Sequence, residues 1–152
     1  MQNIVLPQHP DNVIENYREV NAHIHTVYKA ITVPEHLSKW WGPNGFTNTF
    51  NEYDFRVGGK WDFIMHGPDG TNYHNESIFV KIEEPELVVF NHISAPQFQA
   101  VIQLKEIDGH KTEVNFKQVF ETPEACQKLK AFCLEKNEEN LDRLEAELAN
   151  IK

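Results

Sequence analysis

Two adjacent tryptophans followed by a glycine- and proline-rich turn constrain the fold of this chain more than any other feature. The segment WWGPNGF at positions 40–46 ends a short helical pattern, because Gly and Pro interrupt helices. Gly58-Gly59 then enters a strand with alternating aromatic residues, and a second turn at positions 67–70 (GPDG) ends that strand. This order predicts an antiparallel sheet that curls around bulky apolar groups.

The residues before the double tryptophan predict one strand and two short helices. A strand is expected over 12–20, and Asn21 then offers an N-cap for a helix over 22–31. Pro34 suits the first turn of a second helix over 35–41, because its missing N–H would be unpaired there in any case.

From Phe46 to Phe120 the apolar period changes towards two, and turn signals divide this part into six strands. Asp108-Gly109 is expected to form a hairpin turn, because this dipeptide tolerates the positive φ angles that such turns require. The inward faces predicted by alternation comprise Trp61, Phe63 and Met65, then Ile78, Val80 and Ile82, then Phe98, Ala100, Ile102 and Leu104, and finally Val114, Phe116 and Phe120.

A long C-terminal helix is predicted from Thr122, a good N-cap, with Pro123 at its first position. Its two cysteines would lie about 10 Å apart at 1.5 Å per residue, which excludes a disulfide between them. Asn137 interrupts the apolar stripe, so we expect a polar group that faces the domain, either in a pocket or bridged by solvent. The stripe consists of Cys126, Leu129, Cys133, Leu141, Leu144, Leu148 and Ile151.

The chain has 152 residues, enough for one domain with its own core. We expect residues 1–11 to form a loose leader and residues 12–152 a single domain. The formal net charge of -9 argues against nucleic acid as a partner, because a polyanion normally requires a face rich in Lys and Arg. No run approaches the ~18 apolar residues that cross a bilayer, and the N-terminus lacks a signal-peptide pattern, so we expect a cytoplasmic protein without membrane insertion.

The predicted order of elements is that of an α+β helix-grip fold, in which a curved antiparallel sheet of about seven strands wraps around a long C-terminal helix. Five segments closely resemble the branch of the START-like, Bet v 1-like (SRPBCC) superfamily grouped with activators of the heat-shock-protein-90 ATPase. The resemblance covers Val13 to Leu148 and rests on AITVPEHLSKWWGPNGFTNTF, DFRVGGKWDFIMHGPDGTNYHNES, EEPELVVF, TEVNFKQVF and NLDRLEAEL.

The resemblance implies a small apolar molecule held between the sheet and the long helix. Some relatives catalyse cyclisation or hydrolysis in that place. The family commonly has Gly-Trp where Lys136-Asn137 stand, so this chain is expected to have a larger cavity with an added hydrogen-bonding group.

Candidate ligand-binding residues are aromatic side chains and isolated polar groups on inward faces. We expect one of the two tryptophans to fill the core and the other to contact a ligand or a partner chain. Gln118 either bonds to its neighbours or orients a ligand, Glu76 either lines the cavity or faces water, and His66 is expected to point outward. The candidates are Trp40, Trp41, Phe46, Trp61, Phe63, Met65, Glu76, Ile78, Phe98, Phe116, Gln118 and Asn137.

Motifs for other chemistries are missing from the sequence. His66 and His74 flank a turn and could lie close together, but no third metal ligand has a recognisable spacing. No nucleophile elbow and no phosphate-binding glycine loop occurs, because Gly58-Gly59 leads into a strand rather than a helix. We therefore predict no catalytic residue, no metal and no cofactor.

The sequence and its resemblance to this family support three hypotheses for function. The first is a ligand-binding domain for a small apolar or aromatic molecule. The second is a cyclase- or hydrolase-like enzyme that uses Glu76 or a histidine as general base, with Gln118 or Asn137 polarising a carbonyl. The third is a stress-related interaction module with a chaperone partner. The sequence leaves open whether the protein is a monomer or a homodimer.

Overall fold

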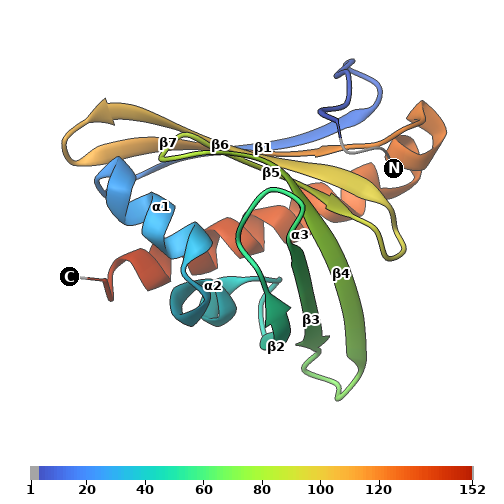
Figure 1. Cartoon of the computed structure of the whole chain (residues 1–152), viewed down its shortest axis with the longest axis horizontal. Coiled ribbons are helices and arrows are strands. Elements are labelled where there is room, and N and C mark those ends of the chain that lie inside the picture. The colour runs from blue at the N-terminus through green and yellow to red at the C-terminus, as the bar shows by residue number, and fades with distance from the viewer. Residues whose placement is uncertain (1–3, 152) are drawn as a thin grey trace.

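The computed structural model describes residues 4–151, and its seven strands form one antiparallel sheet. The strand order is β1-β7-β6-β5-β4-β3-β2, so the first and last strands of the chain are neighbours. In Figure 1, β3 and β4 bend away from the layer of β1, β7, β6 and β5, and α3 runs across the concave side. The elements are β1 (Val13–Val20), α1 (Ile24–Thr32), α2 (Pro34–Trp40), β2 (Thr47–Tyr53), β3 (Lys60–His66), β4 (Asn72–Glu83), β5 (Leu87–His92), β6 (Phe98–Asp108), β7 (Lys111–Val119) and α3 (Pro123–Leu148).

This arrangement confirms the predicted α+β helix-grip fold, but the start of the first helix differs. Helix α1 begins at Ile24, and its cap is the ring of His23, which accepts from the backbone N–H of His25. The predicted cap, Asn21, lies outside the helix. The hydroxyl of Thr112 donates to the carbonyl of Ala22 at 2.8 Å and so holds this part of the chain against β7.

The hairpin between β6 and β7 forms at Asp108-Gly109 as predicted, but not with the expected backbone conformation. The φ of Gly109 lies outside the left-handed region. A bulge between Glu106 and Asp108 shifts the register of the two strands instead. The turn is therefore closed by an irregular strand end rather than by a positive φ.

Strand β4 carries a bulge that reverses its predicted alternation. The register shifts between Phe79 and Lys81, so Phe79 lies in the main core while Val80 packs on the outer face of the sheet. Before the bulge, Ser77 faces inward opposite Trp61, and the outward positions belong to Glu76 and Ile78. The predicted inward face of Ile78, Val80 and Ile82 was thus wrong for its first two members, because a bulge changes the phase of a strand.

Helix α3 closes the concave side of the sheet. Thr122 accepts from the backbone N–H of Ala125 at 3.2 Å, and Pro123 lies in the first turn, as predicted. Arg18 of β1 forms ion pairs with three carboxylates along the helix, at 2.6 to 2.9 Å. The apolar stripe is buried at Cys126, Leu141, Leu144 and Leu148, half-buried at Leu129 and Cys133, and continues at Ile151 beyond the helix end. Both cysteines are free, and burial raises the pKa of both thiols.

The outer face of the sheet carries a small apolar cluster that the N-terminal segment partly covers. Leu6 packs on this cluster, and its backbone N–H donates to the side-chain oxygen of Gln99 at 2.8 Å. The Gln99 side-chain nitrogen donates in turn to the carbonyl of Ile4 at 2.7 Å. Ile4 and Leu6, within the leader expected over 1–11, are therefore bonded to Gln99 of the sheet. The first three residues of that leader lie outside the described part. The buried members of the cluster are Val80, Val89, Val101 and Val119.

Candidate functional site

A cavity of about 200 Å³, hereafter the deep cavity, lies between α3 and the concave face of the sheet. Aromatic side chains from the sheet and from the loop after α2 form most of its walls. Amide, imidazole and ammonium groups supply its polar atoms. The lining residues are Trp41, Gly42, Pro43, Phe63, Met65, Asn75, Phe90, His92, Pro96, Phe98, Phe116, Gln118, Lys136, Asn137 and Asn140.

An open groove of about 590 Å³, hereafter the outer groove, adjoins the deep cavity. The side chain of Phe132 on α3 is 62% exposed at this groove, and the rings of Phe46 and Tyr73 lie 5.9 Å apart between their centroids. The groove therefore offers an apolar entrance. The residues that line both spaces are Pro43, Met65, Asn75, Pro96 and Lys136.

Arg143 of α3 holds the loop that walls the deep cavity. One terminal nitrogen of its guanidinium donates to the carbonyls of Gly42 and Pro43 at 2.7 and 2.8 Å, and lies 3.4 Å from that of Trp41. The other donates to the carbonyls of Lys39 and Phe46, at 3.0 and 2.8 Å. A single side chain thus satisfies carbonyls on both sides of the turn.

Three side-chain amides form a hydrogen-bond chain along the wall made by α3, β1 and β7. The amide nitrogen of Asn137 donates to the side-chain oxygens of Asn16 and Gln118, at 3.1 and 2.8 Å. The amide nitrogen of Asn16 donates to the carbonyl of Leu134 at 3.1 Å and to the carboxylate of Glu138 at 2.8 Å. Asn137 therefore faces the domain as predicted, and Gln118 is bonded to a neighbouring side chain.

His92 at the end of β5 forms the opposite polar wall. Its Nδ1 bonds to the carbonyl of Pro96 at 2.8 Å, and its Nε2 lies 2.7 Å from the side-chain oxygen of Asn75. The imidazole stacks on Phe98, with 4.7 Å between the ring centroids. The ring thereby fixes the β5–β6 loop and strand β4 beside the cavity.

Burial lowers the pKa of His92, against the opposing effect of its bond to the Pro96 carbonyl. An unfolded histidine binds a proton near pH ~6.5, so below that pH the unfolded chain holds more protons at this residue than the folded protein does. The free energy of unfolding is therefore expected to fall as the pH drops below about 6.5.

Replacing His92 by Gln is expected to flatten this fall by up to about 1.4 kcal/mol per pH unit. Urea unfolding at a series of pH values from about 7 to about 5 measures the slope. His110→Gln, in the exposed β6–β7 turn, is the control and should keep the slope of the parent protein. An unaltered slope in His92→Gln would contradict the lowered pKa.

Most of the predicted aromatic candidates meet at the deep cavity. Phe46 instead lines the outer groove, and Met65 lines both spaces. The predicted residues at the deep cavity are Trp41, Phe63, Met65, Phe98, Phe116, Gln118 and Asn137.

Four candidates lie elsewhere, each for a physical reason. Trp40 is 4% exposed, and its indole N–H donates to the carbonyl of Ala30 at 2.8 Å, so it fills the core beside α1. Trp61 is 1% exposed and stacks behind Phe63, with 4.3 Å between the ring centroids. The other two, Glu76 and Ile78, face outward because of the β4 register described above.

The deep cavity is also lined by three residues that were not predicted, namely His92, Asn75 and Asn140. His92 shares the phase of Phe90 along β5, and Asn140 lies one helical turn after Asn137, so both positions carried a usable signal. Asn75 carried none, because its approach to His92 depends on the pairing of β4 with β5.

The outer face of β3 and β4 carries a separate polar cluster. Asp62, His74 and Glu76 each bring one possible metal-ligand atom within 4.8 Å of the others. His74 bonds to Asp62 at 2.8 Å, and this bond lowers the pKa of the Asp62 carboxyl. The ammonium of Lys60 lies 3.9 Å from Glu76 and offsets part of the negative charge. The cluster is an ion-pair network in this structure.

His66 and His74 flank the β3–β4 turn, but the hydrogen bonds of their rings go to other residues. His66 bonds instead to the hydroxyl of Thr49 and to the side-chain oxygen of Asn72, both at 2.7 Å. It lies on the outer side of β3, as predicted, in phase with Asp62.

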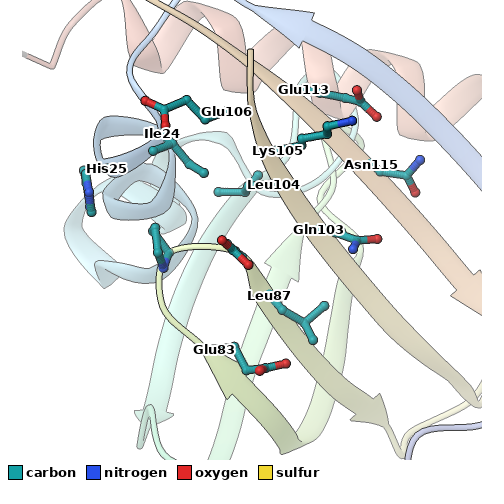
Figure 2. A pocket seen from close by; sticks show the side chains of 12 residues that line it. Ile24, His25, Glu83, Leu87, Gln103, Leu104, Lys105, Glu106, Glu113 and Asn115 are labelled. Atoms are coloured by element: carbon teal, nitrogen blue, oxygen red, sulfur yellow. The ribbon is translucent and has the colours of Figure 1, made fainter. Parts of the chain in front are cut away.

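A second hollow, of about 580 Å³, lies between α1, the β4–β5 turn and strands β6 and β7 (Figure 2). Carboxylates are the most frequent charged groups in its lining, and Lys105 is the only Lys or Arg among the lining residues. Its four carboxylates are those of Glu83, Glu86, Glu106 and Glu113. Because an apolar molecule gains little from such walls, the deep cavity is the better candidate site.

No helix within residues 4–151 is long and apolar enough to span a membrane. A curved sheet that grips a long helix, with two short helices after the first strand, defines a domain of the START-like (SRPBCC) class. Residues 21–149 match the family model described as Activator of Hsp90 ATPase homolog 1-like protein, and the chain belongs to this family. The resemblance found in the sequence is thereby confirmed.

Solved structures of bacterial proteins share this fold. A crystal structure from Nitrosomonas europaea is 20% identical with a TM-score of 0.86, covering 97% of this chain and 100% of the other. A solution structure from Arthrobacter aurescens is 24% identical with a TM-score of 0.85, covering 99% and 94%. A crystal structure of an AHSA1 protein from Silicibacter pomeroyi is 17% identical with a TM-score of 0.73, covering 91% and 98%. The sequence matches no curated protein.

Proposed function

We propose that this protein binds a small, uncharged aromatic or apolar molecule in the deep cavity and admits it through the outer groove. The observation that carries this proposal is a space of about 200 Å³ among aromatic side chains and buried amides. Protein interiors are close-packed, with few voids larger than a water molecule. The deep cavity is open towards the outer groove, and aromatic walls with a few polar groups are the usual make-up of a small-molecule site.

The volumes of the deep cavity and the outer groove indicate that a ligand would occupy both. Ligand pockets typically measure roughly 300 to 1,000 Å³, which exceeds the deep cavity alone. We therefore expect a ligand to extend past Met65 into the outer groove of about 590 Å³. The exposed rings of Phe132 and Tyr73 border that groove and favour an aromatic body.

Binding without covalent chemistry fits the site better than the cyclase- or hydrolase-like alternative. Glu76, the proposed base, lies on the outer face of the sheet. His92 lines the cavity, but each of its ring nitrogens already has an oxygen within 2.8 Å, from Pro96 and Asn75. A general base needs a free nitrogen within reach of the proton it removes.

Filling the cavity tests this proposal. Asn137→Trp is expected to abolish binding of naphthalene and indole, because the indole side chain would occupy the space beside Phe116 and Gln118. Chemical-shift changes in ¹⁵N-labelled protein during titration measure binding. Near-UV circular dichroism checks that the fold persists.

The matched control is Lys128→Trp, which places the same side chain on the exposed face of α3 and should leave binding unchanged. If neither compound shifts the signals of cavity residues in the parent protein, ligand binding at this site is refuted. If Asn137→Trp folds and still binds as the parent does, the ligand lies elsewhere.

A further inference from the structure

The deep cavity leaves hydrogen-bonding atoms of three buried side-chain amides unpaired. Gln118 is 6% exposed, and Asn137 and Asn140 are each 8% exposed. All three line the deep cavity, Gln118 from β7 and the two asparagines from adjacent turns of α3. The partners they do have determine which end of each amide is free.

The direction of each hydrogen bond in the chain of Asn16, Asn137 and Gln118 follows from the bond between Asn16 and the backbone of Leu134. The carbonyl of Leu134 can only accept, and it lies 3.1 Å from Asn16, so the amide nitrogen of Asn16 must face it. The oxygen of Asn16 then faces Asn137, which must donate through its nitrogen. That nitrogen has two hydrogens, and the second goes to the oxygen of Gln118.

Three atoms of these cavity amides have no partner among residues 4–151. They are the side-chain oxygen of Asn137, the nitrogen of Gln118 and the nitrogen of Asn140. The nitrogen of Asn140 is the free end because its oxygen accepts from the backbone N–H of Gly42 at 3.1 Å. The cavity thus presents two donor groups and one acceptor among aromatic walls. These atoms face the open space of the deep cavity, where either water or the polar groups of a ligand would bond to them.

We propose that the deep cavity takes an uncharged aromatic amide or lactam. Its carbonyl oxygen has two lone pairs and would accept from Gln118 and Asn140, while its N–H would donate to Asn137. The aromatic body would lie against Trp41 and Phe116. This inference rests on the proposed ligand-binding function and names the class of ligand.

Two related chemistries fit the same atoms less well. A carboxylate can only accept, so its second oxygen would face the oxygen of Asn137 without a hydrogen between them. A hydroxyl both donates and accepts, but its single oxygen would have to meet all three amides at once. An amide places its acceptor and its donor on two neighbouring atoms, which suits groups from two different elements.

A set of bicyclic probes of similar size separates these possibilities. The probes are 2-quinolone, which is a lactam, N-methyl-2-quinolone, which lacks the N–H, 2-naphthol, which is a hydroxyl compound, and naphthalene. Dissociation constants come from NMR titration of the full chain. We expect 2-quinolone to bind at least about tenfold more tightly than each of the others, because each of them leaves a buried polar group unpaired.

Substitution of the donor provides a second measurement. Gln118→Met keeps the length of the side chain and removes both its donor and the oxygen that accepts from Asn137. Affinity for 2-quinolone should fall about tenfold, while affinity for naphthalene, which makes no hydrogen bond, stays within about twofold. Gln103→Met, on the exposed outer face of β6, is the matched control and should change neither. If Gln118→Met does not fold, Asn140→Asp replaces it, since aspartate keeps the acceptor for Gly42 and removes the other donor.

The outcomes distinguish this inference from the proposed function. Equal affinity for 2-quinolone and naphthalene would overturn the amide assignment and leave ligand binding intact. Tighter binding of 2-naphthol than of 2-quinolone would overturn it in favour of a hydroxyl ligand. If the folded variant, Gln118→Met or Asn140→Asp, keeps the parent's ratio of affinities for 2-quinolone and naphthalene, the amide end of the ligand is not bound by the substituted side chain. Failure of all four probes to bind would refute both the inference and the proposed function.

Discussion

Gly59→Ala is expected to destabilise the protein by about 3 kcal/mol or more, because the added methyl group has no room. A Cβ at this position would lie 1.9 Å from the carbonyl oxygen of Asp54, which belongs to the backbone. The chain cannot move away easily, since the Gly58 N–H donates to the carbonyl of Phe79 at 2.8 Å and the Phe79 N–H donates to that of Gly59 at 3.0 Å. The close approach of the two backbones is what requires glycine.

Thermal and urea unfolding measure this effect, and a loss of roughly 10 °C in Tm is expected for a domain of this size. Gly109→Ala is the matched control. A Cβ there meets no atom within 4 Å, and its φ is not left-handed, so stability should stay the same or rise by up to about 1 kcal/mol. Similar stability of the two variants would show that the strand entry at Gly58-Gly59 tolerates a side chain.

Arg143→Met is expected to cost about 3 kcal/mol and to loosen the loop that walls the deep cavity. Methionine has a similar length but donates no hydrogen bond. The carbonyls of Lys39, Gly42, Pro43 and Phe46, at 2.7 to 3.0 Å from the guanidinium, would all lose this partner. Because Trp41 belongs to the same loop, near-UV circular dichroism should also weaken, and affinity for cavity ligands should fall.

Arg56→Met is the control for this substitution. Arg56 has a side chain that is 72% exposed and forms an ion pair with Asp54 at 2.8 Å, and exposed pairs typically contribute less than about 1 kcal/mol. Its loss should leave both the unfolding midpoint and the tryptophan spectrum nearly unchanged. A comparable stability for Arg143→Met would mean that the loop is held by its aromatic contacts rather than by the guanidinium.

Gly58-Gly59 and Arg143 hold different parts of the fold in place around the candidate site. Gly58-Gly59 brings the entry of β3 against β4 at Phe79, where the bulge of β4 begins. Arg143 brings the α2–β2 loop against the helix. The first fixes the entry of β3 beside β4, and the second fixes the α2–β2 loop beside α3. The loop held by Arg143 lines the deep cavity directly, through Trp41, Gly42 and Pro43.

Residues of the candidate site were predictable where one element alone determines which way they face. Phe63 and Met65 alternate along β3, and Asn137 interrupts the stripe of α3, so local periodicity was enough. Ile78 was assigned to the wrong face, and Glu76, which the sequence left open between the cavity and water, faces outward. The bulge that places them outward depends on the neighbouring strands rather than on the residues of β4 itself.

The sequence by itself determined the order of the elements, the curved sheet around a long helix, and the family, because periodicity, caps and turns are local properties of the chain. Only the tertiary structure decided which ends of the cavity amides are free and brought Asn75 beside His92. Asn16 lies about 120 residues from its partners in α3, at a separation of 118 from Leu134 and 121 from Asn137. The direction of an amide is set by the donors and acceptors that folding brings to it, and no local pattern records them.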